Sequence, residues 1–370
     1  MPRTSATWAA PGRVNLIGEH TDYNLGFALP FAIEQSCTAT VTVVDGTGLV
    51  IRSAQREDTV TLAEDDVRPG ADLDWAGYVA GVVWAVRRDG ARVPGLDIHV
   101  DSTVPVGAGL SSSAALACSV ALAVQDVLGL GLDRDALLAL TRSVENDFVG
   151  APTGGLDQLA ALRCVPGHAL FCDLRSLQTR QVELDVTGHR LAILVIDTRA
   201  HHAHASGEYR ERRDGCERAA ALLGLTSLRE LDMAGLASAL ERLPGDELRR
   251  YTRHVVTENE RVLRTVELLD AGEPESIGPL LTASHASLRD DYRITVPELD
   301  VAVEVALRTG ALGARMTGGG FGGSVIALLP AELVPACERA VAEAFAAHGF
   351  LEPRTFVTAA AGGAREVVPG

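Results

Sequence analysis

The sequence reads Pro105-Val-Gly-Ala-Gly-Leu-Ser-Ser-Ser-Ala-Ala115 where an alternating strand pattern at 95–101 gives way to an apolar helix pattern at 112–128. Gly107 and Gly109 let the backbone approach a ligand closely. The three serines open the helix and predict a serine cap. Unpaired amides and the positive end of the helix dipole make such a helix start a site for anions.

A polyphosphate is the ligand we expect at this loop. The helix behind it is long and apolar, so it can hold the loop rigidly. A capped turn without a ligand is the alternative interpretation. The segment lacks a G-x-S-x-G pattern, so a serine nucleophile on a sharp turn is not supported.

The remaining patterns predict an α+β fold. Asp133 caps a second helix that runs to about residue 147, and the pattern from 208 to about 308 is mostly helical. A glycine-rich turn at 318–323 precedes a strand. Further strands are predicted at 38–44, 95–101, 169–174, 180–186, 191–197 and 324–329.

Length and charge limit the possible functions. A chain of 370 residues predicts about two domains, and we place a boundary near residue 185, between 1–185 and 186–370, although no linker composition marks it. The 49 acidic residues outnumber the 33 basic ones, and every basic residue is arginine. The absence of lysine excludes a Walker-type loop and a lysine nucleophile. The net charge of −16 disfavours nucleic-acid and anionic-membrane partners.

Cysteine usage and hydropathy favour a cytoplasmic protein. No signal-peptide pattern opens the sequence, and no apolar run is long enough to span a bilayer. The six cysteines show no C-x-x-C pair, so we expect neither a zinc site nor a disulfide framework, but buried small hydrophobes.

A magnesium site is predicted near the phosphate loop. Polyphosphate chemistry needs a hard cation, and Mg²⁺ takes few protein ligands. Ser113 offers a hydroxyl, and Glu145, near the end of the next helix, offers a carboxylate. Twelve residues later, Asp157 lies beside a loop rich in glycine and proline. Solvated surface carboxylates are the alternative interpretation.

A polar cluster at 10–24 suits a sugar. It contains Arg13, Asn15, Glu19, His20, Asp22 and Tyr23. Carboxylates beside a histidine and an aromatic ring can accept hydrogen bonds from vicinal hydroxyls. A metal site is the rival interpretation, but the spacing matches no known zinc motif. Arginine suits the stabilisation of a transferring phosphoryl group, a role open to Arg13.

A second histidine cluster, at His201, His202 and His204, could bind a transition metal. No carboxylate or cysteine partner has a recognised spacing, and a surface loop is the alternative.

Three segments, in order along the chain, resemble motifs of the GHMP small-molecule kinases. Gly12-Arg-Val-Asn-Leu-Ile-Gly-Glu-His-Thr-Asp-Tyr23 resembles the galactokinase signature without a departure. Segment 105–115 resembles the family's phosphate loop, and Ala314-Arg-Met-Thr-Gly-Gly-Gly-Phe-Gly-Gly323 resembles its third, glycine-rich motif. Also similar to galactokinases are 207–213, 284–292 and 297–300. The resemblance covers nearly the whole chain.

The resemblance implies a fold and an activity. The fold would be two α+β domains, the first a ribosomal-protein-like two-layer unit, with the active site in the cleft between them. The activity would be ATP-dependent transfer of a phosphoryl group to the anomeric C1 hydroxyl of galactose, with Mg²⁺, in galactose metabolism (the Leloir pathway). We expect a monomer with galactose and ATP as its partners.

The resemblance also implies residue roles. Asp157 would be the catalytic base, with Arg13 beside it, and Ser113 and Glu145 would hold magnesium. The ATP phosphates would lie against Gly107, Ala108, Gly109, Leu110, Ser111, Ser112 and Ser113. The sugar would lie against Glu19, His20, Thr21, Asp22, Gly155 and Tyr209.

Two other functions remain open from the sequence. A kinase for a related sugar, such as N-acetylgalactosamine or arabinose, would differ only in pocket volume around one substituent. A non-catalytic sensor of ATP and galactose would resemble galactokinases but would have a shortened phosphate loop. The loop in this chain is full length, which favours an enzyme.

Overall fold

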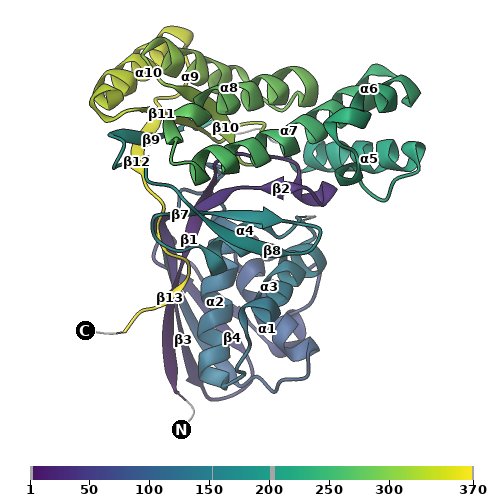
Figure 1. The fold of residues 1–370 in the computed structure, drawn as a ribbon. Coiled ribbons are helices and arrows are strands. Elements are labelled where there is room, and N and C mark those ends of the chain that lie inside the picture. The colour runs from purple at the N-terminus through teal and green to yellow at the C-terminus, as the bar shows by residue number, and fades with distance from the viewer. Residues whose placement is uncertain (1–2, 152, 201–204, 369–370) are drawn as a thin grey trace.

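The computed structural model describes residues 3–151, 153–200 and 205–368, in which helices pack against three β-sheets (Figure 1). The first sheet has the order β13 (Arg365–Glu366), β1 (Ser5–Asn15), β3 (Pro30–Val44), β6 (Gly95–Ser102), β4 (Leu49–Ser53), β5 (Thr59–Leu62). The second has the order β10 (Gly313–Thr317), β11 (Ser324–Pro330), β9 (Leu191–Asp197), β12 (Arg354–Thr358). The third has the order β2 (Phe27–Ala28), β7 (His168–Asp173), β8 (Gln178–Glu183).

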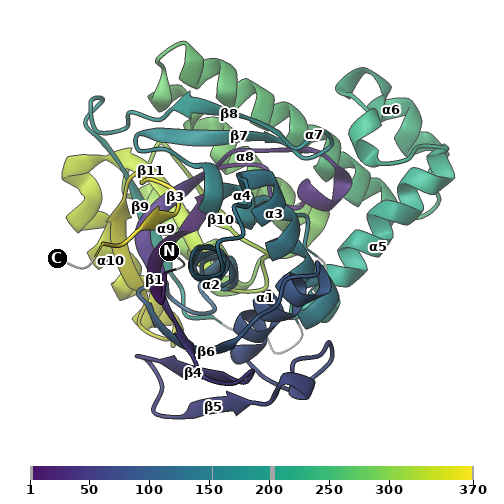
Figure 2. The same ribbon diagram turned by 90° about the horizontal axis from the view of Figure 1, so that it is seen from below.

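We call the chain up to about residue 185 the first half and the remainder the second half. Helices cover one face of the first sheet, so the first half has two layers. Helix α2 (Ser112–Leu128) lies across β1 and β3, and its many alanines let it approach the strands closely. Figure 2 shows α2 nearly end-on, with the other helices of this half around it. These are α1 (Ala76–Arg88), α3 (Arg134–Ser143) and α4 (Leu156–Arg163), with the 3-10 turns η1 (Asp22–Asn24) and η2 (Glu64–Asp66) in the loops.

Most predicted elements are confirmed. Helix α2 has the predicted bounds, and Asp133 caps α3 by accepting hydrogen bonds from two backbone amides. The helix expected to run to about residue 147 instead changes to a wider π-helical segment, η3 (Val144–Val149). The strand expected at 38–44 is the second half of the longer β3.

The second sheet lies between two hydrophobic cores. Every residue of β9 is buried. Leu191, Ile193 and Val195 belong to a core formed mainly by the first half, whereas the alternate residues Leu194 and Ile196 belong to the core of the second. Burial of both faces explains why β9 is a continuous apolar run rather than an alternating one.

Helices of the second half cover the second sheet and reach back to the first half. Helices α8 and α9 pack on β10, and the long α7 packs against α5, α6 and the short β2 (Figure 1). The helices are α5 (Ala205–Leu223), α6 (Met233–Arg242), α7 (Asp246–Asp270), α8 (Gly278–Ser287), α9 (Pro297–Arg308) and α10 (Val334–His348). Shorter turns are η4 (Leu228–Glu230), η5 (Pro274–Ile277), η6 (Leu288–Tyr292) and η7 (Ala331–Leu333).

The C-terminal segment connects the two halves. After β12 pairs with β9, Ala361 bridges to Ala32, and β13 pairs with β1 (Trp8 opposite Glu366). Figure 1 shows this yellow segment running from the second sheet along the first. The boundary near residue 185 stays a prediction.

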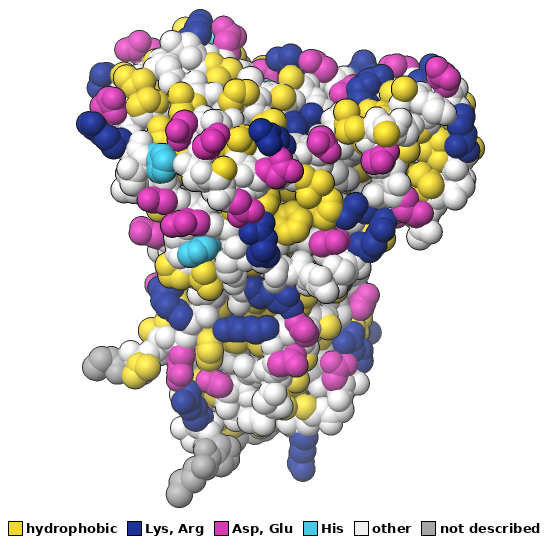
Figure 3. Space-filling view, in the orientation of Figure 1, with side chains coloured by type: hydrophobic (Ala, Val, Ile, Leu, Met, Phe, Trp, Pro, Cys, Tyr) yellow, Lys and Arg dark blue, Asp and Glu magenta, His cyan; other side chains and the backbone are white. Residues whose placement is uncertain are grey.

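The distribution of charged side chains and the burial of the cysteines are consistent with the composition of the sequence. Acidic and basic side chains are interspersed over the face shown in Figure 3. All six cysteines are buried and unpaired, as predicted. Among the described residues no helix is long and apolar enough to cross a membrane. The predicted histidine cluster at His201, His202 and His204 lies outside the residues described.

The contact between α8 and β10 supports the glycine-rich motif that follows β10, and it predicts one stability effect. A Cβ added at Gly313 would overlap the backbone of Gly278, which yields less readily than the end of a flexible side chain would. We expect Gly313→Ala to lower the free energy of unfolding by about 1–3 kcal/mol, as overpacking does.

Denaturant unfolding measures this effect. The matched control is Gly207→Ala, an exposed position of α5 where an added Cβ meets no atom within 4 Å. It should be neutral or stabilising by up to about 1 kcal/mol because alanine favours helix. Equal effects of the two substitutions would contradict the packing argument.

Candidate active site

A cavity of about 190 Å³ lies where the two halves meet. It is lined by Arg13, Glu19, His20, Asp22, Thr153, Gly155, Leu156, Asp157, Tyr209, Gly318 and Gly319. The structure thus brings together residues from β1, the β1–β2 loop, the start of α4, α5 and the third glycine-rich motif. A larger surface hollow of about 690 Å³ between α5 and α7 contains none of the predicted site residues.

Asp157 and Arg13 form an ion pair beside this cavity. Arg13 Nε and Nη2 donate to Asp157 Oδ1 at 2.9 and 2.8 Å. Ser111 Oγ donates to Asp157 Oδ2 at 2.5 Å. The third nitrogen of the guanidinium, Nη1, donates to the carbonyl of Gly109 at 2.6 Å. One arginine therefore holds both the carboxylate and the phosphate loop.

The phosphate loop is anchored through its carbonyls. Ser324 Oγ donates to the carbonyl of Ala108 at 2.7 Å, and the amide of Arg13 donates to the carbonyl of Leu110 at 3.1 Å. Gly109 has φ +73°, and an added Cβ would lie 3.0 Å from the carbonyl oxygen of Thr317. Glycine is therefore required here both by conformation and by the close approach of the third glycine-rich motif.

The role of Ser111 differs from the predicted cap. It occupies the N-cap of α2, but it is left-handed (φ 60°, ψ 45°) and its side chain makes no capping hydrogen bond. Its hydroxyl turns to Asp157 instead. The prediction of a serine cap is thus wrong: the hydroxyl donates to the charged carboxylate from α4, and its oxygen accepts from none of the amides at the start of the helix.

Glu145 and Ser113, the two predicted magnesium ligands, lie within hydrogen-bonding distance of each other. Glu145 is buried in η3, and its Oε2 accepts from Thr153 Oγ1 at 2.7 Å and Gln158 Nε2 at 2.8 Å. Burial, with the nearby negative charge of Asp157, raises the pKa of Glu145, while hydrogen bonds including one from Ser113 oppose the rise.

These residues fit Mg²⁺ bound jointly with a nucleotide. Within the described parts of the chain, no three His, Cys, Asp or Glu side chains gather closely enough to hold a metal. One buried carboxylate with a hydroxyl, completed by phosphate and water, is a donor set that Mg²⁺ accepts.

His20 lines the cavity without a free ring nitrogen. Nε2 lies 3.1 Å from the carbonyl of Gly319, so it carries the proton, and Nδ1 lies 2.6 Å from the hydroxyl of Tyr23. Burial lowers the pKa of His20 to about 3, so the ring is neutral and Nδ1 accepts from Tyr23. Tyr209 packs against His20 with ring centroids 5.1 Å apart.

Asp22 packs tightly against Gly154, which was not among the predicted site residues. The amide of Gly154 donates to Asp22 Oδ2 at 3.0 Å, and a Cβ on Gly154 would lie 2.5 Å from that oxygen. The neighbouring Gly155 has φ +94° and faces Arg142. The two consecutive glycines at 154 and 155 were the feature of the sequence that could have indicated this close packing. Burial, with the charge of Asp157, raises the pKa of Asp22 to about 6.

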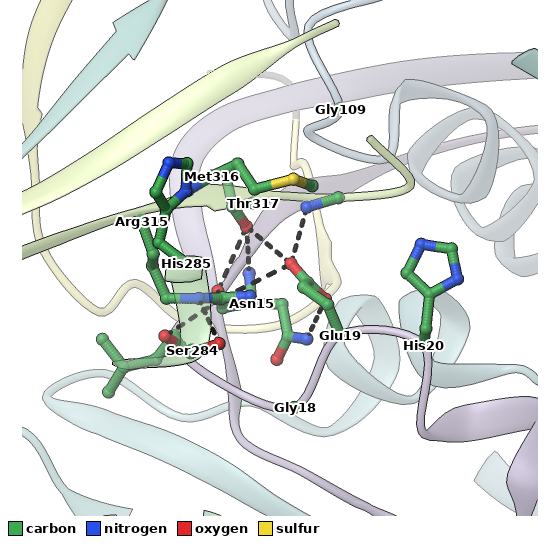
Figure 4. A network of polar contacts seen from close by, with 12 residues as sticks. Asn15, Gly18, Glu19, His20, Gly109, Ser284, His285, Arg315, Met316 and Thr317 are labelled. Carbon is green, nitrogen blue, oxygen red and sulfur yellow. Dashed lines mark hydrogen bonds and ion pairs between the residues drawn. The ribbon is translucent and has the colours of Figure 1, made fainter. Parts of the chain in front are cut away.

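Thr21, predicted to contact the sugar, is not among the residues that line the cavity. Its hydroxyl is within 2.8 Å of the carbonyl of Gly18 and 2.7 Å of that of Phe27, so it closes the loop internally. Glu19 does line the cavity, but its carboxylate is held by protein donors that include the amide of Gly318 at 2.6 Å (Figure 4). Behind it lies the fully buried Arg315, which the sequence reading did not single out.

Three family models match the chain. The galactokinase galactose-binding signature matches residues 2–43, the GHMP kinases N terminal domain matches 77–164, and the GHMP kinases C terminal model matches 265–347. These ranges contain the loop at 10–24, the phosphate loop and the third glycine-rich motif.

Curated relatives and solved structures agree with the family models. A galactokinase of Streptomyces coelicolor is 52% identical over 98% of this chain and 94% of its own. A galactokinase of Mycobacterium tuberculosis is 47% identical over 98% of this chain and 99% of its own. The crystal structure of Lactococcus lactis galactokinase complexed with galactose matches with a TM-score of 0.93 and 30% identity, covering 99% of this chain and 96% of that one.

More distant structures share the fold. The mevalonate kinase of Methanococcus jannaschii matches with a TM-score of 0.69 at 17% identity, over 97% of this chain and 99% of that one. Several galactokinases match at high identity over nearly their full length. Residues of the first and third motifs line one cavity, and Ser111 of the phosphate loop contacts Asp157 in its wall. The chain therefore belongs to the galactokinase family of the GHMP kinases.

Proposed function

We propose that this protein transfers the γ-phosphoryl group of ATP to the anomeric C1 hydroxyl of galactose, giving galactose 1-phosphate and ADP. The observation that carries this proposal is the Asp157 carboxylate, held by Arg13 and Ser111 where the cavity meets the phosphate loop. The similar Lactococcus lactis enzyme was crystallised with galactose, which supports the choice of sugar.

Asp157 acts as the general base. A sugar hydroxyl is a weak nucleophile at neutral pH, so its proton must leave as the oxygen attacks phosphorus. Asp157 takes that proton, the C1 oxygen forms the new bond to the γ-phosphorus, and the electrons of the broken P–O bond remain on ADP. Arg13 keeps the carboxylate oriented and places a permanent positive charge near the transferring group.

Glu145 and Ser113 would hold Mg²⁺ with the nucleotide. When bound, the cation neutralises charge on the phosphate oxygens. The hydrogen bonds from Thr153 and Gln158 fix one oxygen of Glu145, so the carboxylate is pre-oriented. The phosphates would lie along the loop 107–113, in which the carbonyls of residues 108–110 accept hydrogen bonds from Arg13 and Ser324.

The sugar would lie against Asp22, Glu19, Gly155 and Tyr209. Asp22 is the strongest candidate for hydroxyl contacts, because its carboxylate accepts from backbone amides and has no cationic partner within the described part of the chain. His20 would contact the sugar through the carbon atoms of its ring, since both ring nitrogens are already hydrogen-bonded within the protein. From the sequence we further expect a monomer in the cytoplasm, where buried unpaired cysteines stay reduced.

Replacing the proposed base tests the mechanism. Asp157→Asn keeps the shape but cannot take a proton, so kcat should fall by about 10²–10⁴-fold. Galactose affinity, measured calorimetrically, should change much less. Asp270→Asn, an exposed acid paired with Arg180, should keep wild-type kcat. Full activity of Asp157→Asn would refute the assigned base, and no ADP release by the wild type with Mg-ATP and galactose would refute the function.

Replacing Glu145 tests the proposed magnesium site. Glu145→Gln removes the charge, and the Mg²⁺ concentration that half-saturates ATP-analogue binding should rise by about 10–100-fold, the range typical of lost metal-site support. The exposed Glu260→Gln on α7 is the control and should leave it unchanged. An unchanged magnesium dependence in Glu145→Gln would place the cation elsewhere.

The raised pKa of Asp22 predicts pH-dependent sugar binding. Below pH 6 the carboxyl is protonated and accepts fewer hydroxyl hydrogen bonds, so galactose affinity without nucleotide should fall as pH drops from 7.5 to 5. As pH rises from about 4 to about 6, the unfolded chain gives up the Asp22 proton before the folded protein does, so the wild type loses folding free energy. The stability of Asp22→Asn relative to the wild type should therefore rise over this range and level off above about pH 6. A galactose affinity independent of pH from 7.5 to 5 would contradict the assignment.

A further inference from the structure

A buried polar cluster joins the sugar loop to the second half of the protein. We call it the Arg315 network, and it consists of Arg315, Glu19, Asn15, Thr317 and Ser284 (Figure 4). Arg315, on β10, is fully buried. Its Nη1 donates to the carbonyls of Asn15 and Leu16 at 3.0 and 3.2 Å, and its Nε donates to Ser284 Oγ at 3.1 Å.

Glu19 is the centre of this network on the side of the cavity. Its Oε1 accepts from the amide of Gly318 at 2.6 Å and lies 3.2 Å from the Thr317 hydroxyl and 3.6 Å from Arg315 Nη1. Its Oε2 accepts from Asn15 Nδ2. The protein therefore supplies most of the donors that this carboxylate can accept, and at most one position of Oε2 is left for a sugar hydroxyl.

The backbone segment that donates a hydrogen bond to Glu19 also contacts the phosphate loop. Gly318 has φ +92°, and a Cβ there would lie 2.8 Å from the carbonyl oxygen of Gly109. That carbonyl in turn accepts from Arg13, which pairs with Asp157. A short chain of direct contacts thus runs from the wall of the sugar cavity to the phosphate loop.

A purely structural role would not require these charges. Burying an ion pair costs desolvation, and well-packed apolar residues of similar volume are often equally or more stabilising. Among the residues that the structure describes, Arg315 Nη2 has no hydrogen-bond partner. The network instead fixes the relative position of two backbone segments, the sugar loop and the third glycine-rich motif.

We propose that Arg315 and Thr317 are positioning residues that, through Glu19 and Gly318, couple galactose binding to nucleotide binding. This inference rests on the proposed function. Both ligands need the same position of the glycine-rich motif, one through Gly318 and Gly319 in the cavity wall and the other through Gly109. The ligand that binds first fixes that position, and the second binds more tightly.

Calorimetry of the whole protein tests the coupling. Titrating a non-hydrolysable ATP analogue with Mg²⁺, with and without saturating galactose, gives the ratio of the two Kd values. For the wild type we expect galactose to tighten nucleotide binding by about 5-fold or more. Thr317→Val, which removes only the hydroxyl, should reduce this ratio toward 1 while both ligands still bind. Arg315→Met should do the same.

The controls separate coupling from general damage. Val341→Ala opens a cavity in the buried face of α10, away from the network, and should keep the wild-type ratio. If Arg315→Met does not fold, Thr317→Val alone decides. A wild-type ratio in Thr317→Val, an equal loss in Val341→Ala, or a ratio of 1 in the wild type with both ligands bound would overturn the proposal. A wild type that binds no galactose would instead contradict the proposed function, and the coupling with it.

Discussion

The loop that follows β1 must satisfy its backbone polar groups away from water, and the second half of the chain does this for it. Arg315 donates to the carbonyls of Asn15 and Leu16, and His254 lies within 3.1 Å of the carbonyl of Glu19. Glu258 and Asn259 on α7 accept from the amides of Gly18 and Phe27. Unpaired buried amides and carbonyls are costly, so the loop has its shape only when both halves are docked.

The chemistry of the site follows from this docking. The loop carries Glu19, His20 and Asp22 to a cavity whose other walls come from α4, α5 and the third glycine-rich motif. The cavity is strongly acidic, and Arg13 is the arginine in its lining. If ATP binds as proposed, a chain with net charge −16 would receive it at one local site, where amides, a helix start and the proposed magnesium ion would offset the phosphate charge.

Local patterns predicted the parts of the fold that depend on nearby residues. Helix α2, the buried strand β9 and the Asp133 cap all follow from periodicity or from one side chain beside a helix start. The resemblance to galactokinases added the pairing of Arg13 with Asp157. The Arg315 contact to Asn15 spans 300 residues, and no pattern marks such a partner. The turn of Ser111 toward Asp157 escaped prediction for the same reason, because the carboxylate that accepts its hydrogen bond is 46 residues away.

The pairing of β13 with β1 has a consequence for the order of folding. During synthesis, the outer edge of β1 stays without this partner until the chain has grown past Glu366, although β3 can pair with the other edge almost at once. Contacts between residues so distant in sequence slow folding, and an unpaired strand edge attracts other chains. The nascent protein therefore carries an unpaired strand edge at Trp8 and Ala9 until residue 366 has been synthesised.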